Sequence, residues 1–222
     1  MKYKAIIFDM DGTIIDTEHI WQAATQKLIE SKGVKLTPEV AKELQNQTHG
    51  LALIKSCQIL KDLAQIPDSV EDIILQQSNL ACSMYDNQLK FIEGFLKFHK
   101  VVTTKHGLKT GIATNADDAT LHIAKKRLNL EDLFGEHIYN ITHVNNVYKP
   151  NPDLYLHVAK QLNLHPSECV AIEDSHHGIN AAKAAGMFCI GINTSKNREL
   201  LKNSNFIIDH YDEIDLIRLL KI

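Results

Sequence analysis

The sequence is poor in cysteine and has no long apolar run. Its four cysteines, Cys57, Cys82, Cys169 and Cys189, are widely separated and form no CxxC pair. This spacing suits buried free thiols in a reducing compartment better than a disulfide framework. No stretch approaches the roughly 20 apolar residues of a membrane span, and the N-terminal apolar run meets Asp9 too soon for a signal peptide. We therefore expect a cytoplasmic protein with no membrane contact.

An excess of positive charge is also missing. The 222 residues include 24 Lys and Arg against 27 Asp and Glu, a formal net charge of −3. Nothing in this balance suggests a nucleic-acid groove or binding to an anionic membrane surface. The local basic clusters at residues 105–109 and 125–127 are interpreted as solvated faces. The composition is that of a folded protein, long enough for one large domain or for a domain with a substantial insertion.

Six short apolar runs are typical of β-strands, and helix-like segments separate most of them. Several runs are almost wholly apolar, as strands covered on both faces of a parallel sheet require. The expected strands cover residues 4–9, 110–114, 137–141, 168–172, 187–192 and 206–209. The expected helices cover residues 117–129, 152–163, 177–186 and 212–221. This alternation predicts an α/β fold with a doubly wound parallel sheet.

Residues 17–88 interrupt the alternation. They have the pattern of successive amphipathic helices and contain no convincing strand. We therefore expect two domains: an α/β core made of residues 1–16 and 89–222, and an all-α domain of residues 17–88 inserted after the first strand. Residues 12–16 and 86–94 are the expected hinges.

Carboxylates gather at two of the expected strand ends. The first strand runs directly into DMDGT, which contains Asp9 and Asp11, and Asp174 follows the fourth strand. The carboxyl ends of strands in an open α/β sheet are where ligands collect. Like charges held together cost stability unless a cation compensates, and hard carboxylate oxygens suit Mg²⁺. A turn or a helix cap remains the alternative for an isolated Asp-x-Asp.

Groups able to hold a phosphoryl group occupy two further loops. Thr114 and Asn115 end the second strand and offer a hydroxyl, an amide and backbone N–H groups. Lys149 precedes a loop that two prolines stiffen, and its charge could offset that of carboxylates and phosphate. A strand-end turn and an exposed lysine are the alternatives for these residues taken singly. Together with the acidic residues, however, they predict a phosphoryl-transfer site.

Four motifs make the sequence similar to the haloacid-dehalogenase-like superfamily, in particular its hydrolases with a helical cap of the C1 type. The motifs DMDGTIIDT, IATNA, YKPNPDLYL and IEDSHHGINAAKAAGM occur in the family's order, with the helical insertion after the first. The resemblance implies a Rossmann-like core and a Mg²⁺-dependent phosphatase. Such an enzyme would hydrolyse a small phosphorylated metabolite through an aspartyl-phosphate intermediate.

The resemblance also implies a role for each motif residue. Asp9 would be the nucleophile, and Asp11 would protonate the leaving oxygen and then activate water. Mg²⁺ would be bound by the carboxylates of Asp9 and Asp174 and the main-chain carbonyl of Asp11, with Glu173 in or near its shell. The phosphoryl group would be bound by Thr114, Asn115 and Lys149.

Three functions, two catalytic and one non-catalytic, fit this resemblance. The preferred one is hydrolysis of a sugar phosphate or a phosphoglycolate-like metabolite by a monomer or weak homodimer. The first alternative is a β-phosphoglucomutase-like phosphomutase, which shares the core and the cap. Its expected cap arginine is missing from the cap-loop sequence NQTHG, and the first arginine of the chain is Arg127, which favours hydrolysis. The second alternative is a non-catalytic phosphate-binding protein.

Substrate choice is expected to come from the cap. Residues 44–55, LQNQTHGLALIK, end one helix and start another with Gly50 as the break. The candidates for substrate contact in this stretch are Gln47, Thr48 and His49. Behind them lie His19 and Trp21. A helix-end polar position is the alternative for each of these residues.

The loop before the motif lysine departs from the family pattern. Tyr148 occupies a position where the family often has glycine. A tyrosine resists a positive φ, so we expect an altered loop or a narrower site entrance here.

Overall fold

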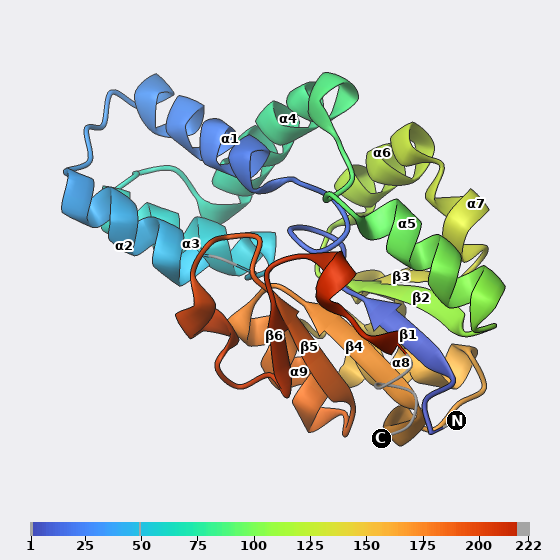
Figure 1. Cartoon of the computed structure of the whole chain (residues 1–222). Helices are drawn as coiled ribbons and strands as arrows, with labels where there is room; N and C mark the ends of the chain where they lie inside the picture. The colour runs from blue at the N-terminus through green and yellow to red at the C-terminus, as the bar shows by residue number, and fades with distance from the viewer. Residues whose placement is uncertain (1, 49, 217–222) are drawn as a thin grey trace.

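The computed structural model describes residues 2–48 and 50–216, without the side chains of residues 86 and 87. Six parallel strands form one sheet in the order β3-β2-β1-β4-β5-β6 (Figure 1). The strands are β1 (Ala5–Phe8), β2 (Lys109–Thr114), β3 (Ile138–Asn140), β4 (Cys169–Glu173), β5 (Phe188–Ile192) and β6 (Phe206–Ile208). Each expected strand is present, and the predicted doubly wound α/β fold is confirmed.

Helices cover both faces of the sheet (Figure 1). One face carries α8 (Asp153–Gln161) and α9 (His176–Ala184), and the other carries α5 (Phe95–Lys100), α6 (Asp118–Leu128) and α7 (Leu130–Phe134). Side chains of β1 alternate between the faces: Ile6 and Phe8 pack with α5 to α7, and Ala5 and Ile7 pack with α8 and α9. All four are fully buried. This two-sided burial explains the wholly apolar runs in the sequence.

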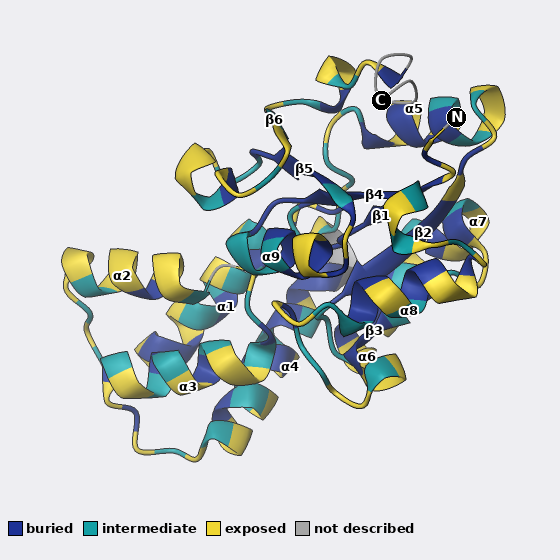
Figure 2. Cartoon of the chain, turned by 90° about the horizontal axis from the view of Figure 1, so that it is seen from below, coloured by how far each residue is buried: buried dark blue, intermediate teal, exposed yellow. Residues whose placement is uncertain are grey.

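Four of the helices between β1 and β2 form a separate group beside the sheet (Figure 1). They are α1 (Glu18–Ser31), α2 (Pro38–Thr48), α3 (Leu53–Ala64) and α4 (Val70–Gln88). Leu28, Leu44, Leu60 and Ile73 pack together in a core of their own. Much of the surface of α2 is exposed (Figure 2). The insertion of helices after the first strand is thus observed, while its bounds at residues 17 and 88 stay a prediction.

The two chain segments that join these helices to the sheet run side by side. The backbone N–H of Asp16 donates to the carbonyl of Lys90, and the N–H of Ile92 donates to the carbonyl of Ile14, both at 2.9 Å. The expected hinge segments are therefore hydrogen-bonded to each other. Their role as hinges stays a prediction.

Several short helical segments were not expected from the sequence. They are α5, α7, a π-helical turn at Val101–Lys105, and 3₁₀ turns at Ile141–Val144, Pro166–Glu168 and Arg198–Leu201. Where a helix was expected over 212–221, the chain forms a further 3₁₀ turn, Tyr211–Glu213, which ends at the extended residue Ile214, and residues 217–222 lie outside the described part. Within the described residues, no helix has the length and apolar character needed to cross a bilayer.

The strand order creates a topological switch point at β1. The chain adds β2 and then β3 on one side of β1, and places β4, β5 and β6 on the other. Loops leaving the carboxyl ends of β1, β2 and β4 therefore diverge, and ligands of open α/β sheets bind in the crevice so formed. Asp9, Thr114 and Asp174 all lie at these three strand ends.

A buried histidine in the aromatic core should make stability depend on pH. The ring of His99 packs beside Phe8, Phe95 and Phe134, and burial lowers its pKa to about 4. The unfolded chain binds this proton near pH 6.5, so stability is lost as pH falls from there toward 4. The loss between pH 7 and pH 5 should be about 2 kcal/mol. Urea unfolding at both pH values measures it.

The matched variant is His99→Phe, which keeps an aromatic ring and removes the titrating group. Its free energy of unfolding should fall less than that of the original protein between the same two pH values. An equal fall in both proteins would show that His99 is not the group responsible.

Candidate active site

A cavity of about 180 Å³ lies between the carboxyl edge of the sheet and the inserted helices. Its wall on the sheet side includes Asp9, Asp11, Thr114, Asn115 and Asp174. Its wall on the other side comes from α1, α2, α3, α4 and the loop between α2 and α3. The strand-end residues predicted from the sequence therefore share one cavity with the helical insertion.

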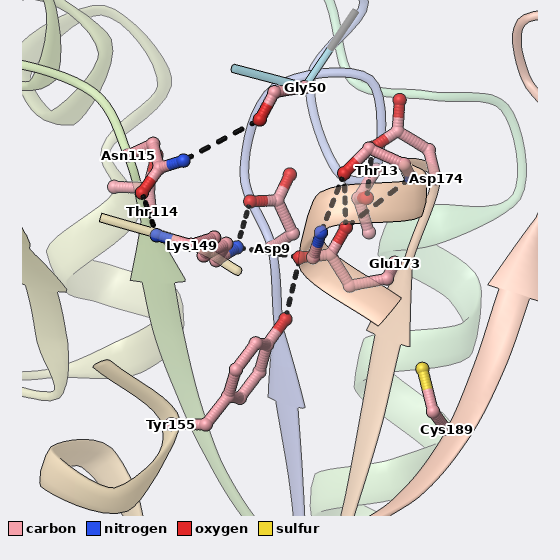
Figure 3. Close-up of polar contacts among 12 residues, drawn as sticks. Asp9, Thr13, Gly50, Thr114, Asn115, Lys149, Tyr155, Glu173, Asp174 and Cys189 are labelled. Atoms are coloured by element: carbon pink, nitrogen blue, oxygen red, sulfur yellow. Dashed lines mark hydrogen bonds and ion pairs between the residues drawn. The ribbon is translucent and has the colours of Figure 1, made fainter. Parts of the chain in front are cut away.

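Lys149 connects two carboxylates beneath this cavity (Figure 3). Its Nζ donates to Asp9 Oδ1 at 2.5 Å and to Glu173 Oε1 at 2.6 Å. The hydroxyl of Tyr155, from α8, donates to the same Glu173 oxygen at 2.8 Å. All four residues are buried. A buried cation between two carboxylates fixes the position of Asp9, and the exposed-lysine alternative is excluded.

The pKa values of Asp9 and Lys149 are strongly shifted by their surroundings. Burial raises the pKa of Asp9 well above its usual value, the charges of Glu173 and Asp174 raise it further, and Lys149 opposes the change. Burial alone would lower the pKa of Lys149, but the neighbouring Asp9 and Glu173 carboxylates raise it overall. The lysine is therefore charged at neutral pH. Asp9, in contrast, lies among like charges, and a further cation would reduce the repulsion between these carboxylates.

Three carboxylates at this end of the cavity have the chemistry of a cation site. Oxygens of Asp9, Glu173 and Asp174 lie within 4.8 Å of one another. Thr13 Oγ1 donates to Asp174 Oδ1 at 3.3 Å, and a Cβ on Gly12 would come within 2.1 Å of Asp174 Oδ2. The φ of Gly12 is +77°, so both the backbone conformation and the lack of space for a Cβ favour glycine at this position. A donor set made only of carboxylate oxygens fits a hard divalent cation.

Asp11 faces the inserted helices. Its Oδ1 accepts hydrogen bonds from Thr17 Oγ1 at 2.8 Å and from the hydroxyl of Tyr85, in α4, at 3.2 Å. Burial raises the pKa of Asp11, and these two hydrogen bonds oppose the rise. Its carboxylate is not part of the three-carboxylate group, which leaves it available to exchange a proton.

Asn115 joins the sheet to the loop between α2 and α3. Its Nδ2 donates to the carbonyl of Gly50 at 3.5 Å, and its Oδ1 accepts from the N–H of Lys149 at 3.1 Å (Figure 3). A Cβ on Gly50 would lie 2.2 Å from the Cβ of Ser175, so the loop packs directly on the core. The Thr114 hydroxyl accepts from the N–H of Ala116 at 3.0 Å and keeps its proton for another acceptor.

The cap candidates from the sequence have different positions. Thr48 and Trp21 line the cavity, whereas Gln47 and His19 do not. Thr48 shares the inward face of α2 with buried Leu44, while Gln47 is on the exposed side, where its amide donates to Glu43 at 2.8 Å. His19 pairs with Asp16 at 3.4 Å. His49 lies outside the described residues.

Tyr148 avoids a positive φ, as expected for a tyrosine, and does not narrow the cavity, because its side chain does not line it. It packs partly buried against the core that α8 and α9 form with the sheet. Upstream in the same loop, Asn145 and Asn146 have positive φ, at +55° and +58°.

Sequence reasoning missed four residues of the site. Tyr155 has the pattern of a core residue of α8, and nothing in the sequence shows that its hydroxyl contacts Glu173. Glu18, Gln22 and Gln45 line the cavity but resemble ordinary solvated helix positions. The orientation of one helix on another places them there, so only the tertiary structure could identify them.

Comparison with known proteins agrees with the fold. The sequence profile described as haloacid dehalogenase-like hydrolase matches residues 6–192. The chain is 30% identical over 184 residues to the phosphorylated carbohydrates phosphatase of Thermotoga maritima, covering 83% of this chain and 82% of that protein. It is 34% identical over 188 residues to a putative phosphatase of Bacillus subtilis, covering 84% and 82%. The fold matches β-phosphoglucomutase of Clostridium difficile with a TM-score of 0.81 at 24% identity, covering 99% and 96%. The chain therefore belongs to the haloacid dehalogenase-like hydrolase family.

Proposed function

We propose that this protein is a phosphoric monoester hydrolase that releases phosphate from a small phosphorylated carbohydrate. The observation that carries the proposal is the buried Asp9, held by Lys149 at 2.5 Å beside Asp174 at the closed end of the cavity. The relative from Thermotoga maritima, named a phosphorylated carbohydrates phosphatase, supports the choice of substrate class. Phosphoglycolate-like metabolites are the less favoured substrates.

In the first half of the proposed reaction, a carboxylate oxygen of Asp9 attacks phosphorus. The new O–P bond forms as the ester P–O bond breaks, and the leaving oxygen takes a proton from Asp11. In the second half, Asp11 takes a proton from water, which attacks phosphorus, releases phosphate and restores the Asp9 carboxylate. The raised pKa of Asp11 suits this exchange, because the carboxyl must be protonated in one half and ionised in the other.

The transferred group would be bound by donors from two loops. We assign its oxygens to the Thr114 hydroxyl, the Asn115 amide and the Lys149 ammonium, which offset its negative charge. Mg²⁺ would be held by Asp9, Asp174 and the main-chain carbonyl of Asp11, with Glu173 close by, and would reduce repulsion between phosphate and the carboxylates. Glu173 itself accepts hydrogen bonds from Lys149 and Tyr155, so its main role is to hold the lysine.

We further propose that residues 17–88 act as a cap that excludes water during the reaction. The contact of Gly50 with Ser175 and the Asn115 hydrogen bond are consistent with a closed arrangement. Thr48 and His49 remain candidates for substrate contact. A cytoplasmic monomer or weak homodimer, without nucleic-acid or membrane partners, remains a prediction.

Phosphate release from p-nitrophenyl phosphate and from a panel of phosphorylated carbohydrates tests the proposal. Activity should require added Mg²⁺, disappear with excess EDTA and return when Mg²⁺ is restored. A protein that binds phosphate without releasing it from any ester would be a binding protein. Conversion of β-glucose 1-phosphate to glucose 6-phosphate in the presence of the bisphosphate, without free phosphate, would identify a phosphomutase instead.

A further inference from the structure

The cavity extends from its phosphoryl-binding end to three polar side chains of the helical insertion. Glu18 begins α1, and its Oε1 accepts hydrogen bonds from Gln22 Nε2 at 3.0 Å and from Gln45 Nε2 at 3.2 Å. Gln22 lies one turn further along α1, whereas Gln45 comes from α2, so the group joins two helices. All three residues line the cavity. We call them the Glu18 group.

Negative charge dominates this cavity. The charged residues in its lining, within the described part of the chain, are all acidic: Asp9, Asp11, Glu18, Asp117 and Asp174. Lys149 lies beneath them, and its Nζ is bonded to two carboxylates. One phosphoryl group would use that lysine and a metal ion. A second anionic group on the substrate would meet Glu18 or Asp117 without a cation to pair with.

We propose that the Glu18 group binds hydroxyl groups of a neutral polyol or monosaccharide, and that Glu18 rejects substrates with a second anionic group. This inference rests on the proposed function, because it concerns the part of the ester remote from the phosphoryl group. A carboxylate accepts hydrogen bonds and an amide both donates and accepts, so the group matches hydroxyls, which do both.

Trp21 adds an apolar surface to the same cavity. Its ring lines the wall next to Glu18 and packs edge-on against Tyr85, with ring centroids 6.1 Å apart. A held aromatic ring can cover the C–H face of a sugar while polar neighbours bind its hydroxyls. The combination suits a polyhydroxylated carbon chain better than a compact carboxylic acid such as phosphoglycolate.

Two substrates that differ in one terminal group test the proposal. Glucitol 6-phosphate ends in CH₂OH where 6-phosphogluconate ends in a carboxylate, and the rest of the chain is the same. We expect kcat/KM to be at least about tenfold higher for glucitol 6-phosphate. The terminal carboxylate of 6-phosphogluconate would face the like charge of Glu18, and two hydrogen-bond acceptors would meet without a donor between them.

The variant Glu18→Gln removes the charge and keeps the shape. The ratio of kcat/KM between glucitol 6-phosphate and 6-phosphogluconate should fall about tenfold toward unity. The matched control is Glu43→Gln, since Glu43 accepts from Gln47 with the same i,i+4 geometry on the far side of α2 from the cavity. That control should leave the ratio unchanged.

The outcomes separate this inference from the proposed function. Equal or faster hydrolysis of 6-phosphogluconate, or equal shifts in Glu18→Gln and Glu43→Gln, would overturn the inference while leaving a phosphatase. Failure to release phosphate from p-nitrophenyl phosphate and from every ester would overturn the proposed function, and the inference with it.

Discussion

Replacing Asp9 with asparagine should lower phosphate release by at least about four orders of magnitude, because an amide cannot act as the attacking carboxylate. The variant should nevertheless fold. Asparagine has the same shape, and the change removes a buried negative charge that lies among Glu173 and Asp174. Lys149 loses one carboxylate partner but keeps the other, Glu173, at 2.6 Å. Thermal unfolding should therefore occur within a few degrees of the original protein.

The measurements are kcat for phosphate release and the unfolding temperature by circular dichroism. Asp16→Asn is the matched control, because Asp16 belongs to the same loop but is exposed and pairs with His19. It should retain nearly full activity. If Asp9→Asn retained a tenth of the original activity in a folded protein, Asp9 could not be the nucleophile.

The sequence predicts the phosphoryl-binding end of the cavity because of a property of parallel sheets. Asp9, Thr114 and Asp174 follow β1, β2 and β4, and the carboxyl ends of these neighbouring strands lie along one edge. Once the apolar runs are recognised as strands, polar residues just after them must meet. More than 100 residues separate Asp9 from Thr114 and from Asp174, yet local patterns suffice to bring them together.

The helical end of the cavity is not predictable in the same way. Gln45 and Gln47 are two residues apart on α2, yet Gln45 lines the cavity and Gln47 bonds to Glu43 on the other side. Both are exposed polar residues of an amphipathic helix, so periodicity shows only that they avoid the helical core. Which of them faces the substrate depends on how α2 is rotated against the sheet. That orientation comes from tertiary packing.

Glu173 has contacts that its position in the sequence does not reveal. The sequence places it beside Asp174, and the resemblance puts it in or near a metal shell. The structure shows its carboxylate beneath the cavity, bonded to Lys149 and Tyr155. Gly178 makes room for it, because a Cβ there would lie 1.7 Å from Glu173 Oε1. Contacts from α8 and α9, which no local sequence pattern reveals, therefore set the surroundings of Glu173.

Replacing Lys149 with methionine should reduce both activity and stability by large amounts. The change leaves two buried carboxylates, Asp9 and Glu173, without their shared cation, and removing one partner from a buried ion pair costs about 3–5 kcal/mol. Lys149 is also the charge that lowers the pKa of Asp9. Without it that pKa rises further, so the destabilisation relative to the original protein should be largest near neutral pH and smaller as pH falls and Asp9 binds a proton.

The double variant Lys149→Met/Glu173→Gln separates the two effects. It removes one of the two carboxylate charges that methionine leaves unpaired, and the Ser175 hydroxyl, which donates to Glu173 Oε2 at 3.1 Å, can turn to accept from the new amide. Urea unfolding should show that the double variant recovers much of the lost stability. Phosphate release should stay low, because the cation that offsets the charge of the phosphoryl group is still missing. Recovery of activity together with stability would mean that Lys149 only supports the fold, and that the charge balance at Asp9 is achieved without it.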